Sequence, residues 1–340
     1  MALREPRVTL AHGGGGRAMR ELVEEVFAAA FGSDAGEDQA RLVHAALEEP
    51  GMRLAFTTDS HVVTPVEFPG GDIGKIAVCG TVNDLAVGGA RPLWLSAAFI
   101  IEEGCDIALL RRIAATMRRE ADAAGVRIVT GDTKVVGRGA ADGVFVTTAG
   151  LGVIPAGRDL RAALIRPGDV AILSGMLGDH GAAILAARGD LALTAGIESD
   201  CAALGHLMEA VLAAAPGVRA ARDVTRGGLA SALNEMAAAA GLEIEIDETA
   251  LPLRGEVRGL CEILGLDPLY LANEGALVLF VPPDQAGAAL QAMRARREGA
   301  DACIIGRAGA GAPGRVSLRT GFGGTRIVDM LAGEQLPRIC

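Results

Sequence analysis

Apolar residues follow two different periods along the chain, and this alternation is the clearest structural signal in the sequence. Short stretches in which apolar residues dominate or alternate with polar ones are typical of strands, whereas longer stretches with apolar residues every three or four positions are typical of helices. In the first half this pattern predicts strands at 52–58, 93–101, 126–130 and 143–153, and helices at 73–87 and 107–124. An amphipathic helix before them is expected to end near Phe31.

The second half of the chain repeats the same alternation. Strands are predicted at 170–174, 242–246, 276–281 and 302–305, and helices at 178–187, 201–214 and 229–240. Proline and glycine residues between 155 and 168 mark a boundary between two halves. We therefore expect an α/β fold with a glycine-rich segment and helix at 1–40, an N-terminal α/β domain at 41–160, a C-terminal α/β domain at 161–325 and a mobile tail at 326–340.

Length and composition exclude several classes of protein. The 340 residues are enough for about two domains, and the formal net charge of −10 argues against a nucleic acid or an anionic membrane as the main partner. No apolar stretch approaches the length of a membrane span, and the first ten residues lack the apolar core of a signal peptide, so we expect a cytoplasmic protein. The six cysteines show no metal-binding spacing and are expected to be reduced.

Three aspartates stand beside hydroxyl or amide side chains at the ends of predicted elements. Asp59 lies in the sequence TTDS, Asp84 in VND and Asp132 in TGDTK. Carboxylates at the strand ends of an α/β domain can converge on one crevice, where they would hold Mg²⁺ together with the phosphate oxygens of a nucleoside triphosphate. The alternative is that each aspartate caps a helix or a turn. Three of them in one domain favour the metal site.

Lysine is rare in this chain, because almost all basic residues are arginines and Lys75 and Lys134 are the only lysines. Lys134 follows Asp132 by two residues, so in an extended segment the two side chains would share one face. A cation at that position would neutralise charge on a phosphoryl group during its transfer. The alternative is an ordinary lysine on the surface.

Three further segments place polar residues at the start of an expected element. The sequence DVTRGG at 223–228 opens a helix, where glycine amides and the Arg226 guanidinium would bind phosphate, unless the segment is an ordinary capped turn. Glu274 precedes a strand and would act as a general base if its surroundings tune its pKa, or it belongs to a turn. His180 precedes another helix and fits a structural role as well as a functional one.

Two candidate mobile segments lie near the ends of the chain. The run Gly13–Gly16 could close over phosphates, although four glycines alone are weak evidence and the sequence of a P-loop is absent. Cys340 is the last residue, and a thiol at the end of a tether can be loaded at one place and processed at another, because its thiolate is a strong nucleophile. The alternative is an incidental cysteine in a frayed tail.

Motifs that follow one another over nearly the whole chain resemble those of one family. They are HGGGG at 12–16, TTDSHVV at 57–63, PGGDIGKIAVCGTVNDLAVGGARP at 69–92, TGDTKVV at 130–136, SGMLGDHGAAIL at 174–185, DVTRGGLASALNEMA at 223–237, LDPLYLANEG at 266–275 and the final LPRIC. On these motifs the chain is similar to the HypE family, the carbamoyl dehydratases of nickel–iron hydrogenase assembly. Gly15 stands where many relatives carry a serine.

The resemblance implies a two-domain fold like that of aminoimidazole-ribonucleotide synthetase, in which the N-terminal domain pairs with a second copy to form a dimer barrel. It also implies a homodimer that uses ATP and Mg²⁺. The acidic and glycine-rich motifs are similar to the ATP site of the family, so the residues expected to contact the cofactor are Asp59, Asn83, Asp84, Gly131, Asp132, Thr133, Asp223, Thr225, Arg226 and Gly227. The expected metal ligands are Asp59, Asp84 and Asp132.

The reaction that the resemblance implies takes place on Cys340. The carbamoyltransferase HypF transfers a carbamoyl group to its sulfur, phosphorylation by ATP activates the amide oxygen, and loss of phosphate and a proton leaves a thiocyanate. The nitrile then passes to iron on the HypC–HypD scaffold complex. Lys134 and Glu274 are both candidates for handling the proton, since a desolvated lysine or glutamate can titrate near neutral pH.

Two alternative functions stay open at this point. Other enzymes of the same fold use ATP, and a thiamine-monophosphate-kinase-like activity is the first alternative. Selenophosphate synthetases usually carry a reactive cysteine or selenocysteine in the N-terminal glycine-rich segment, and residues 12–17 have none. A non-catalytic carrier, in which the nucleotide only switches the position of the Cys340 thiol, is an alternative of another class. The aspartates and the lysine favour chemistry, because a switch needs no base.

Overall fold

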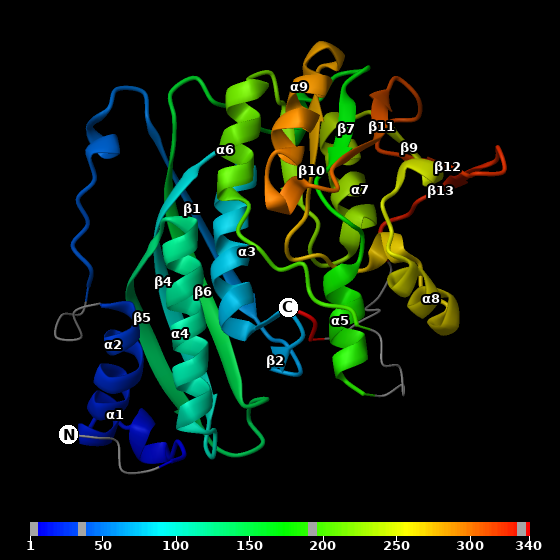
Figure 1. Cartoon of the computed structure of the whole chain (residues 1–340). Coiled ribbons are helices and arrows are strands. Elements are labelled where there is room, and N and C mark those ends of the chain that lie inside the picture. Colours follow the sequence, from blue (N-terminus) through cyan, green and yellow to red (C-terminus); the bar gives the residue numbers. More distant parts are fainter. Residues whose placement is uncertain (1–5, 33–38, 190–195, 332–337) are drawn as a thin grey trace.

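The computed structural model describes residues 6–32, 39–189, 196–331 and 338–340, and it contains two large β-sheets with helix α3 (Ile73–Val87) between them (Figure 1). The first half of the chain forms a four-stranded sheet and the second half a seven-stranded sheet. A short hairpin, β2 (Glu67–Phe68) and β3 (Gly71–Asp72), leads into α3. Both halves therefore combine strands and helices, as the alternating pattern predicted.

The four-stranded sheet has the order β1-β6-β4-β5, so β1 and β5 are its edges. Its strands are β1 (Arg53–His61), β4 (Arg91–Glu102), β5 (Arg127–Val136) and β6 (Val144–Ile154). Strands β4 and β5 are parallel, whereas β6 is antiparallel to both of its neighbours. Two strands separate the edges, so residues on β1 and β5 lie roughly 14 Å apart at the usual spacing of strands.

Helices cover one face of this sheet. Helix α3 is buried over most of its surface because most of its residues are apolar and it packs against both halves of the chain. Helix α4 (Ile107–Ala124) is amphipathic; Asp106 caps its first turn, and Gly125 ends it with a φ of 73°. The N-terminal helical segment packs beside α4 and consists of α1 (Arg17–Leu22), a π-helical turn (Val23–Ala28) and α2 (Ala29–Phe31).

The opposite face of the four-stranded sheet carries exposed apolar side chains. Thr57 of β1 points toward α3, where its hydroxyl contacts Asp84, so the even-numbered residues of this strand point the other way. Leu54 and Phe56 on that face are 64% and 69% exposed, and Ile100 of β4 is 41% exposed. An apolar sheet face of this kind is typical of a surface that another molecule covers.

The seven-stranded sheet has the order β13-β12-β9-β11-β7-β10-β8, and all its neighbouring strands are antiparallel except β9 and β12. Its strands are β7 (Val170–Leu173), β8 (Ala220–Asp223), β9 (Glu243–Asp247), β10 (Leu277–Val281), β11 (Cys303–Gly309), β12 (Val316–Arg319) and β13 (Thr325–Ile327). Strand β10 is buried along its whole length because helices cover both of its faces.

The helices of the second half divide between the two faces of this sheet. Phe280 of β10 packs in a cluster with α7 (Gly228–Ala240), whereas its neighbour Leu279 packs in a cluster with α6 (Gly205–Ala214) and α9 (Pro283–Arg294). This division follows from the alternation of side chains along a strand. Helices α5 (Asp179–Ala187) and α8 (Gly255–Leu264) pack on each other in a third, smaller cluster.

Most of the predicted elements are confirmed, with differences at their ends. The helices expected at 73–87 and 107–124 coincide with α3 and α4, whereas the strand expected at 126–130 extends to Val136 and the helix expected from 201 begins at Gly205. The sequence pattern missed β8, β12, β13, α8 and α9, in which charged residues or glycines interrupt short apolar runs. Strand β13 crosses the expected boundary at 325, and the domain limits stay predictions.

No described helix is long and apolar enough to span a membrane.

Residues 338–340 are docked between the two halves, against the segment that follows β1. The N–H of Val62 donates to the main-chain oxygen of Cys340 at 3.0 Å, and the N–H of Thr64 donates to that of Arg338 at 3.2 Å. Ile339 is 4% exposed and packs in the core of the N-terminal half. Figure 1 shows this end of the chain close to β2 and α5. The expected mobility of the tail stays a prediction, and part of that tail, 332–337, lies outside the described residues.

Candidate active site

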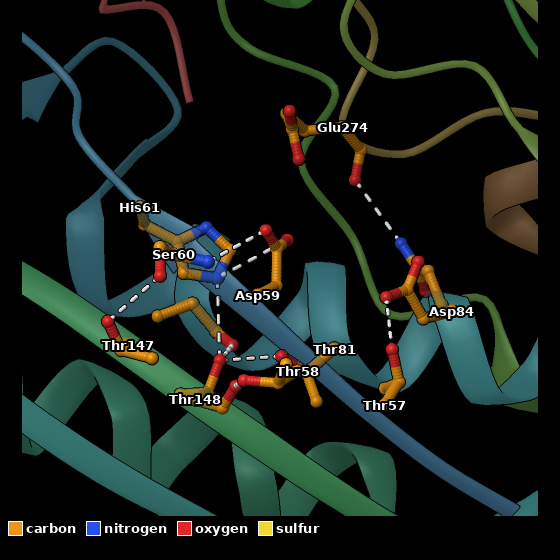
Figure 2. A network of polar contacts seen from close by, with 12 residues as sticks. Thr57, Thr58, Asp59, Ser60, His61, Thr81, Asp84, Thr147, Thr148 and Glu274 are labelled. Atoms are coloured by element: carbon orange, nitrogen blue, oxygen red, sulfur yellow. Dashed lines mark hydrogen bonds and ion pairs between the residues drawn. The ribbon is translucent and has the colours of Figure 1, made fainter.

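Polar side chains of β1 meet the polar side of α3 directly below the docked end of the chain (Figure 2). The hydroxyl of Thr57 donates a hydrogen bond of 2.8 Å to Oδ2 of Asp84. Oδ2 of Asp59 lies 3.6 Å from Nε2 of His61. Gly80 of α3 allows this approach, because a Cβ there would lie 3.1 Å from the His61 ring and 3.3 Å from the Asp59 carboxylate. Two of the predicted metal-binding aspartates, Asp59 and Asp84, are thus brought together.

Asp223 at the end of β8 joins this acidic group. A cavity of about 490 Å³ lies between the two halves and is lined by Thr57, Asp84 and Asp223 among others. Burial, reinforced by the charge of Asp84, raises the pKa of Asp223 to about 7. Burial also raises the pKa of Asp84, with the nearby charge of Asp59 adding to it although the Thr57 hydroxyl opposes it. The site therefore concentrates negative charge that a bound cation would stabilise.

Asp132 lies elsewhere in the chain, on the edge strand β5. Nζ of Lys134 is 3.5 Å from Oδ2 of Asp132, so these two side chains share one face of the strand as predicted. They are separated from β1 by β6 and β4, and one chain therefore does not bring Asp132 next to Asp59 and Asp84. Within the described ranges, no three His, Cys, Asp or Glu side chains are arranged as ligands of one metal ion. The three-aspartate metal site stays a prediction.

A second, larger cavity adjoins β5. Its volume is about 1050 Å³, and its lining includes the predicted site residues Gly131, Asp132 and Thr133. Gly15 and Gly16 of the N-terminal glycine run line the same cavity from the side of α1. The structure thus brings the glycine run next to the polar residues of β5, at a distance from the acidic group of β1 and α3.

Glu274 is a buried carboxyl group in the loop before β10. Its exposed fraction is 3%, and its Oε1 has no hydrogen-bond partner among the described residues. Burial raises the pKa of Glu274 well above its usual value, and the charges of Asp223 and Asp200 raise it further. A carboxylate with a raised pKa and a free oxygen is a stronger base than an ordinary glutamate side chain.

Two side chains hold the main chain of this loop. Oδ1 of Asp200 accepts from the N–H of Glu274, and Oδ2 accepts from the N–H of Gly275 and the amide of Asn273. Asn83 of α3 donates to the main-chain oxygens of Ala202 and Glu274 and accepts from the N–H of Leu204. The predicted cofactor contact of Asn83 would compete with this link between the two halves, since its amide is already engaged on both sides.

The thiol of Cys340 lies at the centre of this group. The charged groups of Arg226, Glu274 and Asp59 lie near enough to the Cys340 sulfur to shift its pKa, and the charges of Glu274 and Asp59 act on Arg226 as well. Burial raises the pKa of the Cys340 thiol to about 12, with Glu274 adding to the shift and Arg226 opposing it. The docked thiol is therefore protonated at neutral pH and is a weak nucleophile in this position.

The glycines of the segment 223–228 have a packing role. A Cβ on Gly227 would lie 2.2 Å from the Ser231 hydroxyl, and one on Gly228 would lie 2.4 Å from the main-chain oxygen of Leu269. Both residues adopt a positive φ, of 80° and 62°. The close approach of α7 to the loop at 269–271 thus accounts for Gly228, and the tight first turn of α7, where Ser231 approaches Gly227, accounts for Gly227. The phosphate contacts expected of Thr225, Arg226 and Gly227 stay predictions.

Sequence reasoning missed two residues of this site. Asp200 stands immediately before the helix expected at 201–214, and its role becomes visible only when the loop carrying Glu274 folds against it. His61 is the last residue of β1, and only Asp59 of its motif had been considered as a site residue. His180, whose role was left open, is buried and contacts the docked tail. The only signal in the sequence for these three residues was an aspartate or a histidine next to a small residue.

Comparison with known proteins identifies the family. The model of the AIR synthase related protein N-terminal domain matches residues 36–154, and that of the C-terminal domain matches residues 166–319. The carbamoyl dehydratase HypE of Rhodobacter capsulatus is 77% identical over 340 residues, which are 100% of both proteins. The chain belongs to the HypE family.

Solved structures of HypE confirm the predicted fold class. The crystal structure of the hydrogenase maturation protein HypE in complex with ATP has a TM-score of 0.92 and 44% identity, over 98% of this chain and 99% of that one. HypE in the HypE–HypF complex has a TM-score of 0.80 and 44% identity, over 91% and 99%. Thiamine monophosphate kinase of Aquifex aeolicus, at 19% identity and a TM-score of 0.62 over 88% and 95%, shares the fold alone.

Proposed function

We propose that this member of the HypE family is an ATP-dependent carbamoyl dehydratase that acts on a carbamoyl group carried by its own Cys340. The observation that supports this most directly is the docked position of the tail, held at Cys340 by Val62 and at Ile339 by His180, which places the Cys340 sulfur near the charges of Arg226, Glu274 and Asp59. The activity named for the Rhodobacter capsulatus protein and the ATP bound in the related HypE structure point the same way.

The proposed reaction converts a thiocarbamate on Cys340 into a thiocyanate. The amide oxygen attacks the γ-phosphorus of ATP and releases ADP, while one N–H proton leaves, which turns a poor leaving group into a phosphate ester. The C–O bond then breaks with loss of the second N–H proton, and phosphate departs as the nitrogen forms its triple bond to carbon. The protein must supply a base near the amide nitrogen and positive charge near the phosphate.

Glu274 is the base that the geometry favours. It lies in the same chain beside the docked Cys340, has a free oxygen, and has a pKa raised toward the range in which a carboxylate takes up a proton efficiently. Lys134 lies on the far edge of the sheet and has no contact with Cys340 among the described residues. We therefore propose that Glu274 removes the N–H protons and that Lys134 acts on phosphate.

A homodimer would bring Lys134 to the site. Strands β1 and β5 are both open edges, and the face that carries Leu54, Phe56 and Ile100 is exposed and apolar. A second copy of the chain that covers this face could place its β5 beside the first copy's β1, so that Asp132 and Lys134 of one chain join Asp59 and Asp84 of the other. This arrangement accounts for the distance between the predicted site residues within one chain.

Mg²⁺ fits the acidic group because its carboxylates are crowded and lack enough positive partners. The charge of Asp59 raises the pKa of Asp84, and the charges of Asp84 and Asp59 raise the pKa of Asp223. Such mutual effects are a sign of uncompensated negative charge. When bound, Mg²⁺ would neutralise charge on the phosphates of ATP. We propose Asp59 and Asp84 as its ligands in one chain, with Asp132 supplied by the second copy.

The loading step is proposed to take place with the tail released. Attack on a carbamoyl donor requires a thiolate, and burial holds the docked Cys340 in its protonated form. The HypE–HypF complex supports HypF as the protein that carbamoylates the released thiol. We propose the HypC–HypD complex as the acceptor of the nitrile, after the tail has left its docked position again.

The decisive experiment follows the mass of the C-terminal peptide. The purified chain is carbamoylated with cyanate, freed of excess reagent and incubated with or without Mg-ATP, and a Cys340→Ala variant serves as the control for modification elsewhere. We expect the loss of one water from the Cys340 peptide only when ATP is present. If the carbamoyl group persists while ATP binds, the carrier alternative holds; phosphorylation of thiamine monophosphate would support the kinase.

A further inference from the structure

His180 joins the docked tail to the C-terminal half of the chain. It stands in the first turn of α5, is fully buried, and meets the edge of the Phe68 ring at a centroid distance of 5.5 Å. Its Nε2 lies 2.6 Å from the main-chain oxygen of Ile339, and its Nδ1 lies 2.8 Å from Oγ of Ser199. Both ring nitrogens are therefore engaged.

The partners of the ring determine which nitrogen carries the proton. A carbonyl oxygen cannot donate, so Nε2 must donate to Ile339. Burial lowers the pKa of His180 to about 4, so the ring is neutral at pH 7 and Nδ1 accepts the Ser199 hydroxyl proton. Ser199 is free to donate because its Oγ accepts the N–H of Cys201 at 3.1 Å. This chain of hydrogen bonds fixes the imidazole as a donor aimed at the tail.

The tail is held through its main chain at three consecutive residues. The oxygens of Arg338 and Cys340 accept from the N–H groups of Thr64 and Val62 in the N-terminal half, and Nη2 of Arg188 also donates to Arg338. The oxygen between them, that of Ile339, accepts from His180. Ile339 is the residue next to the reactive cysteine, so this contact positions the Cys340 sulfur with respect to Arg226 and Glu274.

We propose that His180, oriented by Ser199, is the latch that holds the tail in its docked position, and that it is a positioning residue for the dehydration step. Loss of its N–H donor leaves a buried carbonyl oxygen without a partner, which favours the released tail. Release of the tail has opposite consequences for the loading of the thiol and for the dehydration step. It exposes the thiol for loading, and it removes the carbamoyl group from Glu274. This last consequence rests on the proposed function, whereas the latch itself does not.

The first test measures release without any catalysis. The rate at which iodoacetamide alkylates Cys340 is read from the C-terminal peptide in the absence of nucleotide, for the parent chain and for His180→Phe, Ser199→Ala and His180→Gln. Loss of a buried hydrogen bond predicts an increase of roughly 5- to 100-fold in His180→Phe. The increase is smaller in Ser199→Ala, which keeps the ring. His180→Gln retains an N–H donor near the position of Nε2 and stays close to the parent rate.

The second test measures dehydration of the carbamoylated chain in a single turnover with saturating Mg-ATP. We expect His180→Phe to be slowed by a factor similar to its gain in alkylation, with an unchanged Kd for ATP, and His180→Gln to be rescued in both assays. Equal alkylation rates in all four proteins would overturn the latch. Slower alkylation together with slower dehydration would assign His180 a purely structural role. A parent chain that shows protected alkylation but no dehydration would refute the proposed function and leave the latch intact.

Discussion

The carboxylate of Asp200 fixes the backbone of Glu274, because its Oδ1 accepts the N–H of Glu274 at 3.0 Å. The same carboxylate accepts the N–H of Gly275 at 3.1 Å and the amide of Asn273 at 2.8 Å. The free oxygen of Glu274 thus belongs to a residue whose loop is held by Asp200 at three adjacent positions, through two main-chain N–H groups and the side-chain amide of Asn273. A base that must reach a carbamoyl group on a docked tail needs this kind of support.

The Asp200→Asn substitution tests this support. The variant keeps the size of the side chain but replaces an acceptor by an N–H₂ group, so at least one of the three hydrogen bonds is lost. We expect single-turnover dehydration to fall by roughly 10- to 100-fold, the equivalent of about 1.5–3 kcal/mol for a hydrogen bond to a charged group. The Kd for ATP should not change. An unchanged rate would show that the loop holds Glu274 without Asp200.

The Glu274→Gln substitution tests the base itself. It keeps the volume and the buried position but cannot accept a proton, and general-base catalysis contributes typically about 10²–10⁴-fold. We expect a loss of that order in the dehydration rate while carbamoylation of Cys340 by cyanate continues. The parent enzyme should lose activity toward acid at a pH well above the usual pKa of a glutamate, because burial raises the pKa of Glu274. Comparable rates in both proteins would transfer the role to another group.

The pH dependence of stability should report the neutral, buried His180. The unfolded chain binds a proton near pH 6.5, whereas the folded chain binds it only near pH 4. Folding therefore releases a proton between these values, and the free energy of unfolding falls as the pH is lowered, by at most about 1.4 kcal/mol per pH unit. Urea unfolding at pH 7 and pH 5 measures this difference. It should be smaller in His180→Gln, and an equal difference in both proteins would contradict the shift.

Mixed dimers test whether two chains share a site. Glu274→Gln and Lys134→Ala are each expected to be inactive, but a dimer with one copy of each would contain one intact site if Lys134 comes from the other chain. Random mixing then predicts recovery of roughly a quarter of the parent activity. Each variant alone, treated in the same way, is the control. A mixture that stays inactive would place both residues in a site of one chain.

The close packing of Gly228 predicts a strong effect on stability. A Cβ there would lie 2.4 Å from the main-chain oxygen of Leu269, at a φ of 62°, so Gly228→Ala is expected to cost about 3 kcal/mol or more from strain and displacement. Gly241 at the end of α7 has a similar φ of 65° but no atom within 4 Å, so Gly241→Ala should cost only about 1 kcal/mol. Chemical denaturation of both variants compares them directly.

The sequence predicted the parts of the fold that depend on local pattern. Helices α3 and α4 were located to the residue because each begins directly after a capping aspartate, Asp72 or Asp106, and ends before a glycine. Strand β8 was missed because it is short, two of its four residues are charged and only Ala220 is buried. Its place is set by pairing with β10, a partner more than fifty residues away, and no local pattern carries that information.

The candidate site was predictable as a set of residues but not as an arrangement. The acidic residues Asp59 and Asp84 do lie together, whereas Asp132 lies across the sheet, since the strand order β1-β6-β4-β5 is a property of the whole fold. Asp200 was not recognised because its partners lie more than seventy residues away and two of the three are main-chain N–H groups, which leave no mark in a sequence. For the same reason the sequence could not show that His180 contacts the tail.

The position of helix α3 has a consequence for the way the molecule comes apart. Because α3 is buried by both halves, and Asn83 ties it to Ala202 and Glu274, separating the halves would strip the apolar surface of the helix and break its buried hydrogen bonds together. Calorimetry should therefore show one cooperative transition for both halves rather than two. Opening about a hinge between the two halves is therefore costly, and in the proposed reaction the last few residues of the chain would have to carry the group into and out of the buried site.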